Sequence, residues 1–507
     1  MDYSAGNRRL VKNTIFNYIQ LPVSIIIGLI TSRIVLQILG VSDYGLFSIV
    51  GGVLGMFTFF ASSLSAATTR FINFEMGKPD GDLNKVFNTC LTLHVLFAIG
   101  FIIIAEVGGI WYIDNYLNVE PGKEADAMFI YQVTLAVFCI GLVNIPYQSL
   151  LTAFEKFGLI AIINITNMLL KLGLVYLLFI FRGNLLRTYA LLMASVTLVS
   201  FIVYHVLAYR YWPDVVRHRF IRRNPMYKDI LVFNNYNLLH TVAMMARDTG
   251  SNLLINFFFG TAVNGVYSIS KTIQTSVNSL IVNIDSASGP QITQSYSSGD
   301  MNRCNALVEN ISRISIVIAT AASFILFTEL PAILELWLKD VPEGTLIFSQ
   351  LMLLLVVVSS TSCGLTLMIN ASGKIKWFRI VTSLLFILCL PVGYLLFKIG
   401  FPAYWIVLLF ILVDVVWRIF QLVMMKTIIN FDVKNYLKSA YPRVLMTMAI
   451  LAGYLVLYRL VGPAGIWKIP AFLTTALFSG SVAIFVGLKK TEREKIADMV
   501  REKISKR

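Results

Sequence analysis

The stretch that decides the fold runs from Phe233 to Asp285 and contains two apolar segments with polar residues inside them. Residues 233–260 read FNNYNLLHTVAMMARDTGSNLLINFFFG, and residues 264–285 read NGVYSISKTIQTSVNSLIVNID. Each segment is long enough to cross a bilayer as a helix, which takes about 20 residues. Arg247 and Lys271 would then lie at membrane depth, where a charge costs about 2.5 kcal/mol or more. Such residues normally face the interior of a helix bundle or a water-filled cavity.

The composition of the whole chain is that of an integral membrane protein. Of its 507 residues, 57% are hydrophobic and only 14% are charged, whereas soluble domains have about 25% charged residues. The net charge is +15, but the basic residues lie in short loops between apolar runs and form no basic face for nucleic acid. The five cysteines and four histidines have no metal-binding spacing, and no phosphate-binding loop is present. The sequence therefore predicts neither an enzyme nor a bound cofactor or metal.

Long apolar runs predict an all-α polytopic membrane protein with about fourteen transmembrane helices, since β-barrels show short alternating strands instead. The expected spans are residues 12–39, 43–67, 86–111, 127–152, 158–181, 186–208, 230–258, 263–287, 309–336, 345–371, 377–397, 402–425, 444–462 and 467–488.

The distribution of lysine and arginine predicts the orientation of these spans. Of the 42 basic residues, 30 fall on the segments that share a side with the N-terminus, 7 on the opposite side and 5 within spans. Because basic loops stay in the cytoplasm, both termini are predicted to be cytoplasmic.

The sequence also indicates an internal repeat. Leu39-Gly40 with Tyr44-Gly45 matches Phe259-Gly260 with Asn264-Gly265 at an offset of 220 residues, and Asn17 falls on Asn237 at the same offset. An even number of spans in each half gives both halves the same orientation, as in a parallel repeat. The predicted parts are a six-helix lobe (1–209), a basic cytoplasmic linker (210–229), a second six-helix lobe (230–425), two extra helices (426–488) and a basic cytoplasmic tail (489–507).

Charged residues within the spans are the candidate functional groups. Arg33, Lys171 and Lys271 have no acidic residue on an adjacent turn, which favours a role in a cavity over a local ion pair. Asp414 and Arg418 lie four residues apart, so self-pairing and a functional role are equally good interpretations.

The N-terminal pattern Arg33-Ile-Val-Leu-Gln-Ile-Leu39-Gly40, followed by Asp43-Tyr44-Gly45-Leu46-Phe47, resembles the opening of polysaccharide biosynthesis flippases. These proteins, which include O-antigen flippases, belong to the multidrug/oligosaccharidyl-lipid/polysaccharide (MOP) exporter superfamily. The resemblance covers nearly the whole chain through its span count and its two halves.

The resemblance implies a flippase of the bacterial cytoplasmic (inner) membrane that moves undecaprenyl-pyrophosphate-linked oligosaccharide to the outer leaflet. Transport would occur by alternating access through a cationic central cavity, coupled to Na⁺ or H⁺. The implied partners are this lipid-linked substrate and membrane phospholipids, with a polysaccharide polymerase or chain-length machinery as a further candidate. The resemblance implies that Arg33, Lys171, Arg247 and Lys271 bind the pyrophosphate. Asn17 and Asn237, which lie on polar stripes of the first span of each half, are further candidate substrate-binding residues, and the candidate coupling or gating residues are Asp248, Asp414 and Arg418.

Several alternatives remain. A multidrug cation exporter of the same superfamily would need membrane-depth carboxylates in its first half, where Arg33 and Lys171 lie instead. A lipid II flippase would share the fold. A membrane polymerase or ligase would need a large outer loop, and a scaffold would have no use for buried charge.

Overall fold

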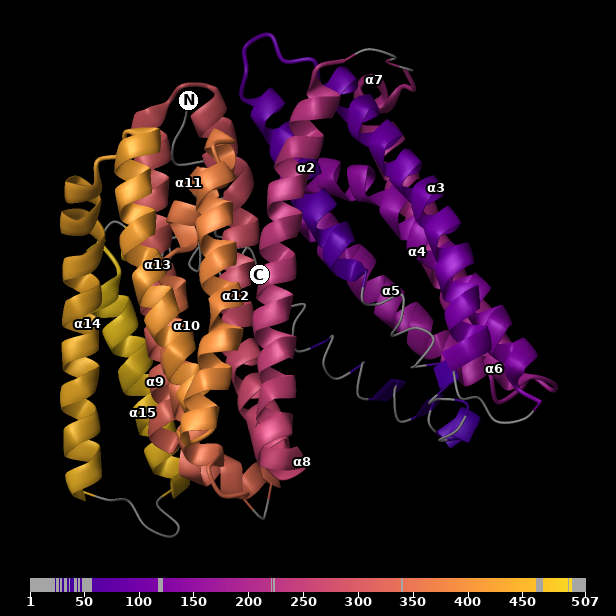
Figure 1. Cartoon of the computed structure of the whole chain (residues 1–507). Helices are drawn as coiled ribbons and strands as arrows, with labels where there is room; N and C mark the ends of the chain where they lie inside the picture. The colour runs from indigo at the N-terminus through magenta and orange to yellow at the C-terminus, as the bar shows by residue number, and fades with distance from the viewer. Residues whose placement is uncertain are drawn as a thin grey trace, which may run out of the picture. The chain divides into compact units, whose positions relative to one another are not determined.

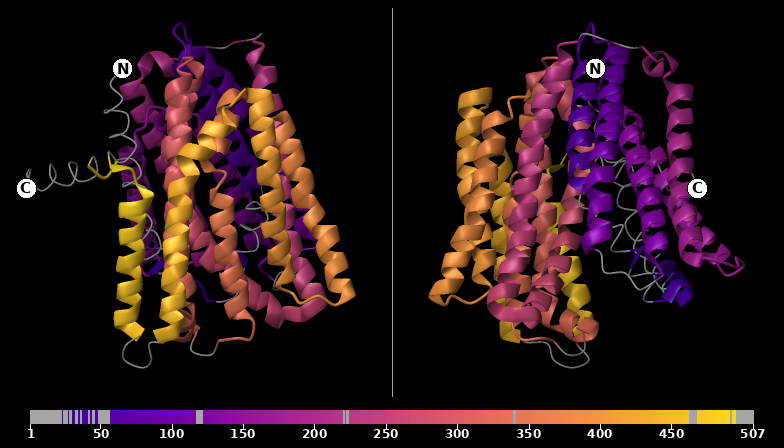
Figure 2. Two further views of the ribbon diagram at one scale, coloured as in Figure 1. Left: turned by 90° about the vertical axis from the view of Figure 1, so that its left-hand side faces the viewer. Right: turned by 45° about the vertical axis from the view of Figure 1, so that its right-hand side comes forward.

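The computed structural model describes residues 57–116, 122–219, 221, 224–338, 341–461, 468–490 and 492–494, with single positions and short runs between 23 and 47. Within these ranges the regular structure is helical and contains no strand. By its internal contacts the chain divides into two units, Met1–Leu238 and Leu239–Arg507. The predicted all-α, multi-span class is confirmed (Figures 1 and 2).

The described part of the first unit consists mainly of long helices joined by short turns. The helices are α2 (Thr58–Met76), α3 (Leu83–Tyr116), α4 (Glu124–Ala153), α5 (Phe157–Leu177), α6 (Leu185–Tyr211) and the short α7 (Pro213–Val216). Leu64, Tyr131 and Leu142 are among the fully buried residues of the core that these helices share. The Tyr131 hydroxyl donates to the carbonyl of Ala105 at 2.6 Å, which ties α4 to α3 and satisfies a polar atom inside the core.

Helix α8 (Met226–Ser297) belongs to both units and contains a sharp break at Gly260. Gly260 has φ 77° and ψ −175°, a conformation that residues with a Cβ avoid. The halves on either side correspond to the predicted spans 230–258 and 263–287. The first turns of α8 pack within the first unit, because the Ser63 hydroxyl donates to Asn234 Oδ1 at 2.9 Å and Phe233 contacts Phe71 edge-on.

The remaining helices form the second unit. They are α9 (Met301–Leu338), α10 (Thr345–Ser360), α11 (Cys363–Ser372), α12 (Lys376–Ile399), α13 (Trp405–Ile429), α14 (Val433–Val461) and α15 (Lys468–Val482), followed by the π-helix η2 (Ala483–Gly487).

Among the described residues, three cores hold the second unit together. One is shared by α8, α10, α12 and α13 around Met352 and Phe410. The second, shared by the second half of α8 with α9 and α10, includes Ile281. The third joins α9 to α14 around Ile316 and Val444. Each core lies between apolar faces of long helices, as expected for a bundle in a membrane.

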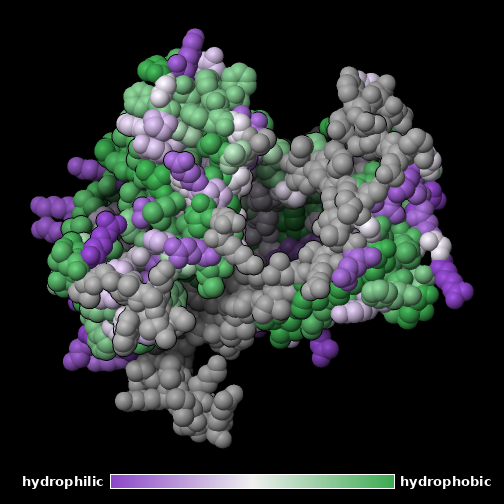
Figure 3. Space-filling view, turned by 90° about the horizontal axis from the view of Figure 1, so that it is seen from below, coloured by the Kyte–Doolittle hydropathy of each residue, from purple (hydrophilic) through white to green (hydrophobic). Residues whose placement is uncertain are grey.

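Nine of the described helices are long and apolar enough to cross a membrane, and the bent pair α10–α11 makes a tenth. With the two halves of α8, this accounts for the predicted spans from the third to the fourteenth. Most of the first predicted span, residues 12–39, and residues 48–56 of the second lie outside the described residues. Apolar side chains also cover wide areas of the surface seen in Figure 3, as lipid contact requires.

The structure corrects several predicted spans, of which two bear on the packing. Helix α2 continues to Met76, nine residues beyond the predicted end at residue 67, because polar residues such as Thr68 and Asn73 are buried against neighbouring helices. The predicted span 345–371 is not a single helix: α10 and α11 meet at an angle of 44° across Thr361 and Ser362.

Candidate functional site

The two halves of α8 bring together charges that are far apart in the sequence. Asp248 precedes Gly260 by twelve residues and Lys271 follows it by eleven, so they lie at the same level of a helical hairpin. Lys271 Nζ is 2.9 Å from Asp248 Oδ2. Near the break, Asn264 Nδ2 donates to the carbonyl of Asn252 at 2.8 Å, which also holds the halves together.

Arg247 extends this pair into a charge network of four residues: Arg247, Asp248, Lys271 and Asp414. Arg247 Nε is 3.4 Å from Asp248 Oδ1, and Arg247 Nη1 is 3.3 Å from Asp414 Oδ1 on α13. The hydroxyl of Ser359, close to the α10–α11 bend, donates to Asp414 Oδ2 at 2.5 Å. The network therefore joins both halves of α8 to α10 and α13 and contains as many carboxylates as cations.

The charge network has a buried end and an accessible end. The side chains of Arg247 and Asp414 are 10% and 8% exposed, whereas those of Asp248 and Lys271 are 33% and 26% exposed. The Arg247 guanidinium also lies 4.1 Å from the ring centre of Phe386 and 5.0 Å from that of Phe410, within cation–π range. A charged ligand would therefore meet Asp248 and Lys271 first, with Arg247 held behind them.

Arg418 does not form the ion pair with Asp414 that their spacing allows. Among the described residues the ion-pair partner of Asp414 is Arg247, and Arg418 Nη1 donates to Gln421 Oε1. Gln421 Nε2 in turn donates to Thr366 Oγ1 at 3.4 Å. Because Arg247 reaches Asp414 from another helix, the local interpretation of Asp414 and Arg418 as a self-contained pair is wrong.

The other predicted site residues are not part of this network. Lys171 lies on α5 with an exposed side chain and forms no ion pair with a described residue. Asn237 is buried in α8, within the first unit. Arg33 and Asn17 lie outside the described residues. Lys271 does have an acidic partner, but on the other half of α8 rather than on an adjacent turn.

Sequence reasoning missed a further acidic residue that is buried inside the second unit. Glu329 on α9 is only 3% exposed. Its Oε1 accepts a hydrogen bond from Thr475 on α15 at 2.8 Å, and its Oε2 accepts one from Tyr458 on α14 at 3.0 Å. Its position inside the apolar run 309–336 could have identified it as a residue buried at membrane depth. Its contacts attach the two C-terminal helices to α9.

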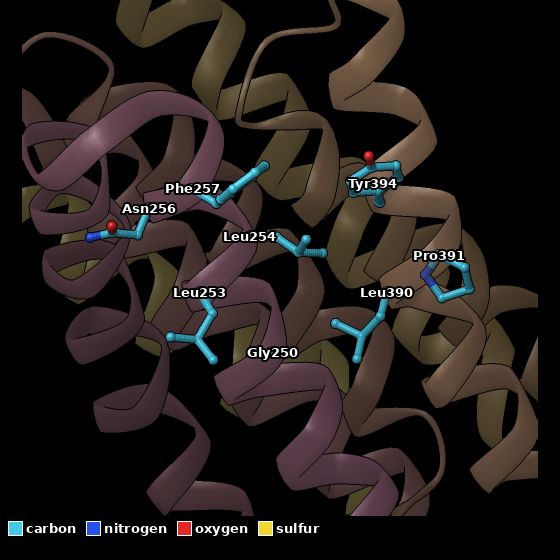
Figure 4. Close-up of a pocket in the computed structure, with 8 residues that line it drawn as sticks. All are labelled: Gly250, Leu253, Leu254, Asn256, Phe257, Leu390, Pro391 and Tyr394. Carbon is cyan, nitrogen blue, oxygen red and sulfur yellow. The ribbon is translucent and has the colours of Figure 1, made fainter.

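An apolar groove of about 670 Å³ lies between the first half of α8 and α12. In Figure 4, Leu254 of α8 and Leu390 of α12 point toward each other in this groove. Gly250 lets the helices approach, since a Cβ there would lie 2.7 Å from Leu390 Cδ2. Gly250 follows Arg247 by one helical turn, but the groove lining includes no charged residue.

No group of three or more histidine, cysteine or acidic residues placed to hold a metal occurs within the described ranges. The free cysteines are all buried. The chemistry that the second unit offers is therefore ionic recognition by the charge network.

A family model described as "Polysaccharide biosynthesis protein" matches residues 10–296, more than half of the chain. The chain belongs to the polysaccharide biosynthesis protein family. The match includes the first half of the α8 hairpin and Lys271. A search of curated proteins finds no match.

Solved structures share the fold of this family member. A mutant of a MATE protein has a TM-score of 0.71 and 14% identity over 84% of this chain and 97% of its own. An outward-facing multidrug resistance MATE family transporter of the MOP superfamily has a TM-score of 0.70 and 14% identity, with 83% and 96% covered.

A MOP superfamily transporter from Pyrococcus furiosus, described as having a binding pocket of reverse polarity that suggests a different function, has a TM-score of 0.67 and 13% identity, with 82% and 95% covered. At these identities the likeness shows the fold. Together, the family and the fold support a transporter of the MOP superfamily.

Proposed function

We propose that the protein is a flippase that moves undecaprenyl-pyrophosphate-linked oligosaccharide, such as an O-antigen, capsular or exopolysaccharide repeat unit, from the inner to the outer leaflet of a bacterial cytoplasmic membrane. Transport would proceed by alternating access through a cationic cavity, with Na⁺ or H⁺ as the coupling ion. Membership of the polysaccharide biosynthesis family supports the substrate class. The single structural observation that supports anion recognition is the accessible Lys271, backed by the buried Arg247.

In this proposal Asp248 acts as an internal substitute for the substrate's phosphate. Its two oxygens contact Arg247 and Lys271, the same cations that a pyrophosphate would contact. Arginine can form paired hydrogen bonds to phosphate, and lysine acts as a point charge on a flexible chain. An arriving pyrophosphate would compete with Asp248 for Lys271, while Asp414 and Ser359 keep Arg247 in position.

Exchange of Asp248 for phosphate would also link binding to conformational change. The Lys271–Asp248 pair joins the two halves of α8, and Asp414 joins α8 to α13. A ligand that replaces one of these contacts changes the relative stability of the arrangements that the helices can adopt. Asp248 and Asp414 are therefore the proposed gating residues, and Arg418, one turn after Asp414 on α13, is proposed as a third. Arg33, Lys171, Asn17 and Asn237 are proposed to complete the substrate site.

The experiment that tests this function is mass spectrometry of undecaprenyl-linked glycans in cells that lack the protein, with leaflet accessibility probed. One finished repeat unit should accumulate on the cytoplasmic face. Wild-type protein should clear it, Lys271→Gln should not, and Lys438→Gln, which changes an exposed lysine of α14, should behave as wild type. An unchanged lipid-linked pool together with new sensitivity to cationic drugs would instead identify a multidrug exporter, and accumulation of lipid II would identify a lipid II flippase.

A further inference from the structure

The segment after α6, expected as a linker, is held firmly against α3. Residues 213–219, called the basic strap below, begin with the short helix α7 and continue as irregular chain. The side-chain amide of Asn84 donates to three of its carbonyls, those of Asp214 at 2.9 Å, Val215 at 3.0 Å and Arg217 at 2.8 Å. These bonds satisfy the carbonyls at the end of α7, which would otherwise lack partners.

Asn88, one turn further along α3, binds the second part of the basic strap. Its Nδ2 donates to the carbonyl of Arg217 at 3.0 Å, and its Oδ1 accepts from the backbone N–H of Arg219 at 3.0 Å. A residue in a parallel β-sheet bonds the adjacent strand in the same way. It binds the carbonyl of one residue and the N–H of the residue two positions further along. Asn88 is 2% exposed, so this contact is shielded from water and keeps the strap in a defined conformation.

The anchored backbone carries two exposed arginine residues. Arg217, which has φ −52° and ψ 120°, and Arg219 are both exposed. Asn84 and Asn88 bond backbone groups of these two residues. A phosphate group can accept paired hydrogen bonds from more than one arginine, so this short segment offers two guanidinium groups to such a ligand.

The end of α6 indicates that the basic strap lies at the membrane surface. Leu198, Ile202 and Val206 are exposed at helical spacing, as expected for a face in contact with lipid. Tyr209 and Tyr211 follow, 41% and 47% exposed. Aromatic residues of this kind gather at the level of the lipid headgroups. The strap begins two residues after Tyr211.

We propose that the basic strap is a binding site for the phosphate of anionic phospholipids on the side predicted to be cytoplasmic. Asp214 is the one acidic residue of the strap, while Lys85 and Arg210 add exposed positive charge beside it. The contacts of Asn84 and Asn88 make this site more than a cluster of surface charge, because they hold both arginines in place before a lipid arrives.

The test is native mass spectrometry of the full-length protein released from nanodiscs of phosphatidylcholine with and without phosphatidylglycerol. The double variant R217Q/R219Q should bind phosphatidylglycerol about 30-fold more weakly, since a basic residue near an anionic surface contributes about 1 kcal/mol. The control R182E/K398E, which changes two exposed cations predicted to lie on the opposite side, should bind it normally. Equal retention by R217Q/R219Q and wild type would overturn the proposal.

Two further measurements distinguish binding at the anchored strap from nonspecific attraction to its positive charge. The variant N84A/N88A keeps every charge of the strap but loses its anchoring, so it should also bind phosphatidylglycerol more weakly; unchanged binding would show that the anchoring is irrelevant. Inorganic phosphate alone should give no thermal stabilisation in phosphatidylcholine nanodiscs. Stabilisation equal to that given by phosphatidylglycerol would contradict the assignment to a lipid headgroup.

Discussion

Arg247 has the most contacts of any side chain in the charge network. The side chain is 10% exposed, and its guanidinium contacts two carboxylates and two aromatic rings. Removing one partner of a buried ion pair leaves an uncompensated charge, which costs about 3–5 kcal/mol. We therefore expect Arg247→Gln to lower the free energy of unfolding by about that amount, as measured by thermal or denaturant unfolding in detergent.

The exchange R247D/D414R is the control for this prediction. It restores opposite charges on α8 and α13, so it should recover part of the stability that either single change loses. A double-mutant cycle measures this coupling. If the effects of the two single changes simply add, the ion pair between Arg247 and Asp414 does not stabilise the unit.

The sequence identifies the unusual residues of the charge network but does not identify which residues they contact. Arg247, Asp248, Lys271 and Asp414 are recognisable as unusual because charge is costly in an apolar segment. Their pairing depends on Gly260, which returns the chain so that Lys271 meets Asp248, and on the packing of α13 against its neighbours. The spacing along one helix favours an ion pair between Asp414 and Arg418. It does not reveal that Arg247, on another helix, lies closer to Asp414 than Arg418 does.

The contact of α9 with α11 leaves no room for a side chain at Gly364. A Cβ at Gly364 would lie 2.5 Å from the Val308 carbonyl oxygen and 2.6 Å from the Ser312 hydroxyl. Since the carbonyl belongs to a helix backbone and cannot move aside, Gly364→Ala should destabilise the protein by about 1–3 kcal/mol. Thermal unfolding of the purified variant measures this.

Gly453 provides the matched comparison. It lies within α14, and apart from its chain neighbours and the backbone of its own helix, no atom of the described residues lies within 4 Å of the position that a Cβ would occupy there. Gly453→Ala should therefore leave stability unchanged or raise it by about 0.5–1 kcal/mol through helix propensity. Equal destabilisation by both substitutions would show that loss of glycine flexibility, and not the contact with α9, is responsible.

Helices are the level at which sequence prediction succeeds best. Long apolar runs predict the described spans because lipid requires every backbone hydrogen bond to be made within a helix. The bend between α10 and α11 is missed, although the run Ser359-Ser360-Thr361-Ser362 marks it. Those residues are polar rather than helix-breaking, and only their contacts, such as Ser359 with Asp414, distinguish a bend from a continuous helix.

For the molecule as a whole, the positive-inside distribution predicts which ends of the helices face the cytoplasm. The five native cysteines are buried, so an introduced cysteine should be the one that reacts. Arg182→Cys and Lys398→Cys should react with a membrane-impermeant maleimide in intact cells. Lys85→Cys and Lys434→Cys, also at accessible positions, should react only after the membrane is permeabilised. The reverse pattern would invert the predicted topology.

The charge network has a consequence for the energetics of transport. Two cations and two carboxylates sum to zero, so rearrangement of this network without substrate moves little net charge across the membrane. A bound pyrophosphate would make the network negative. Bacterial cells are negative inside, and each charge crossing a potential of about 100 mV gains about 2.3 kcal/mol. Under the proposed function, voltage would drive the outward movement of the loaded network and would not oppose the return of the empty one.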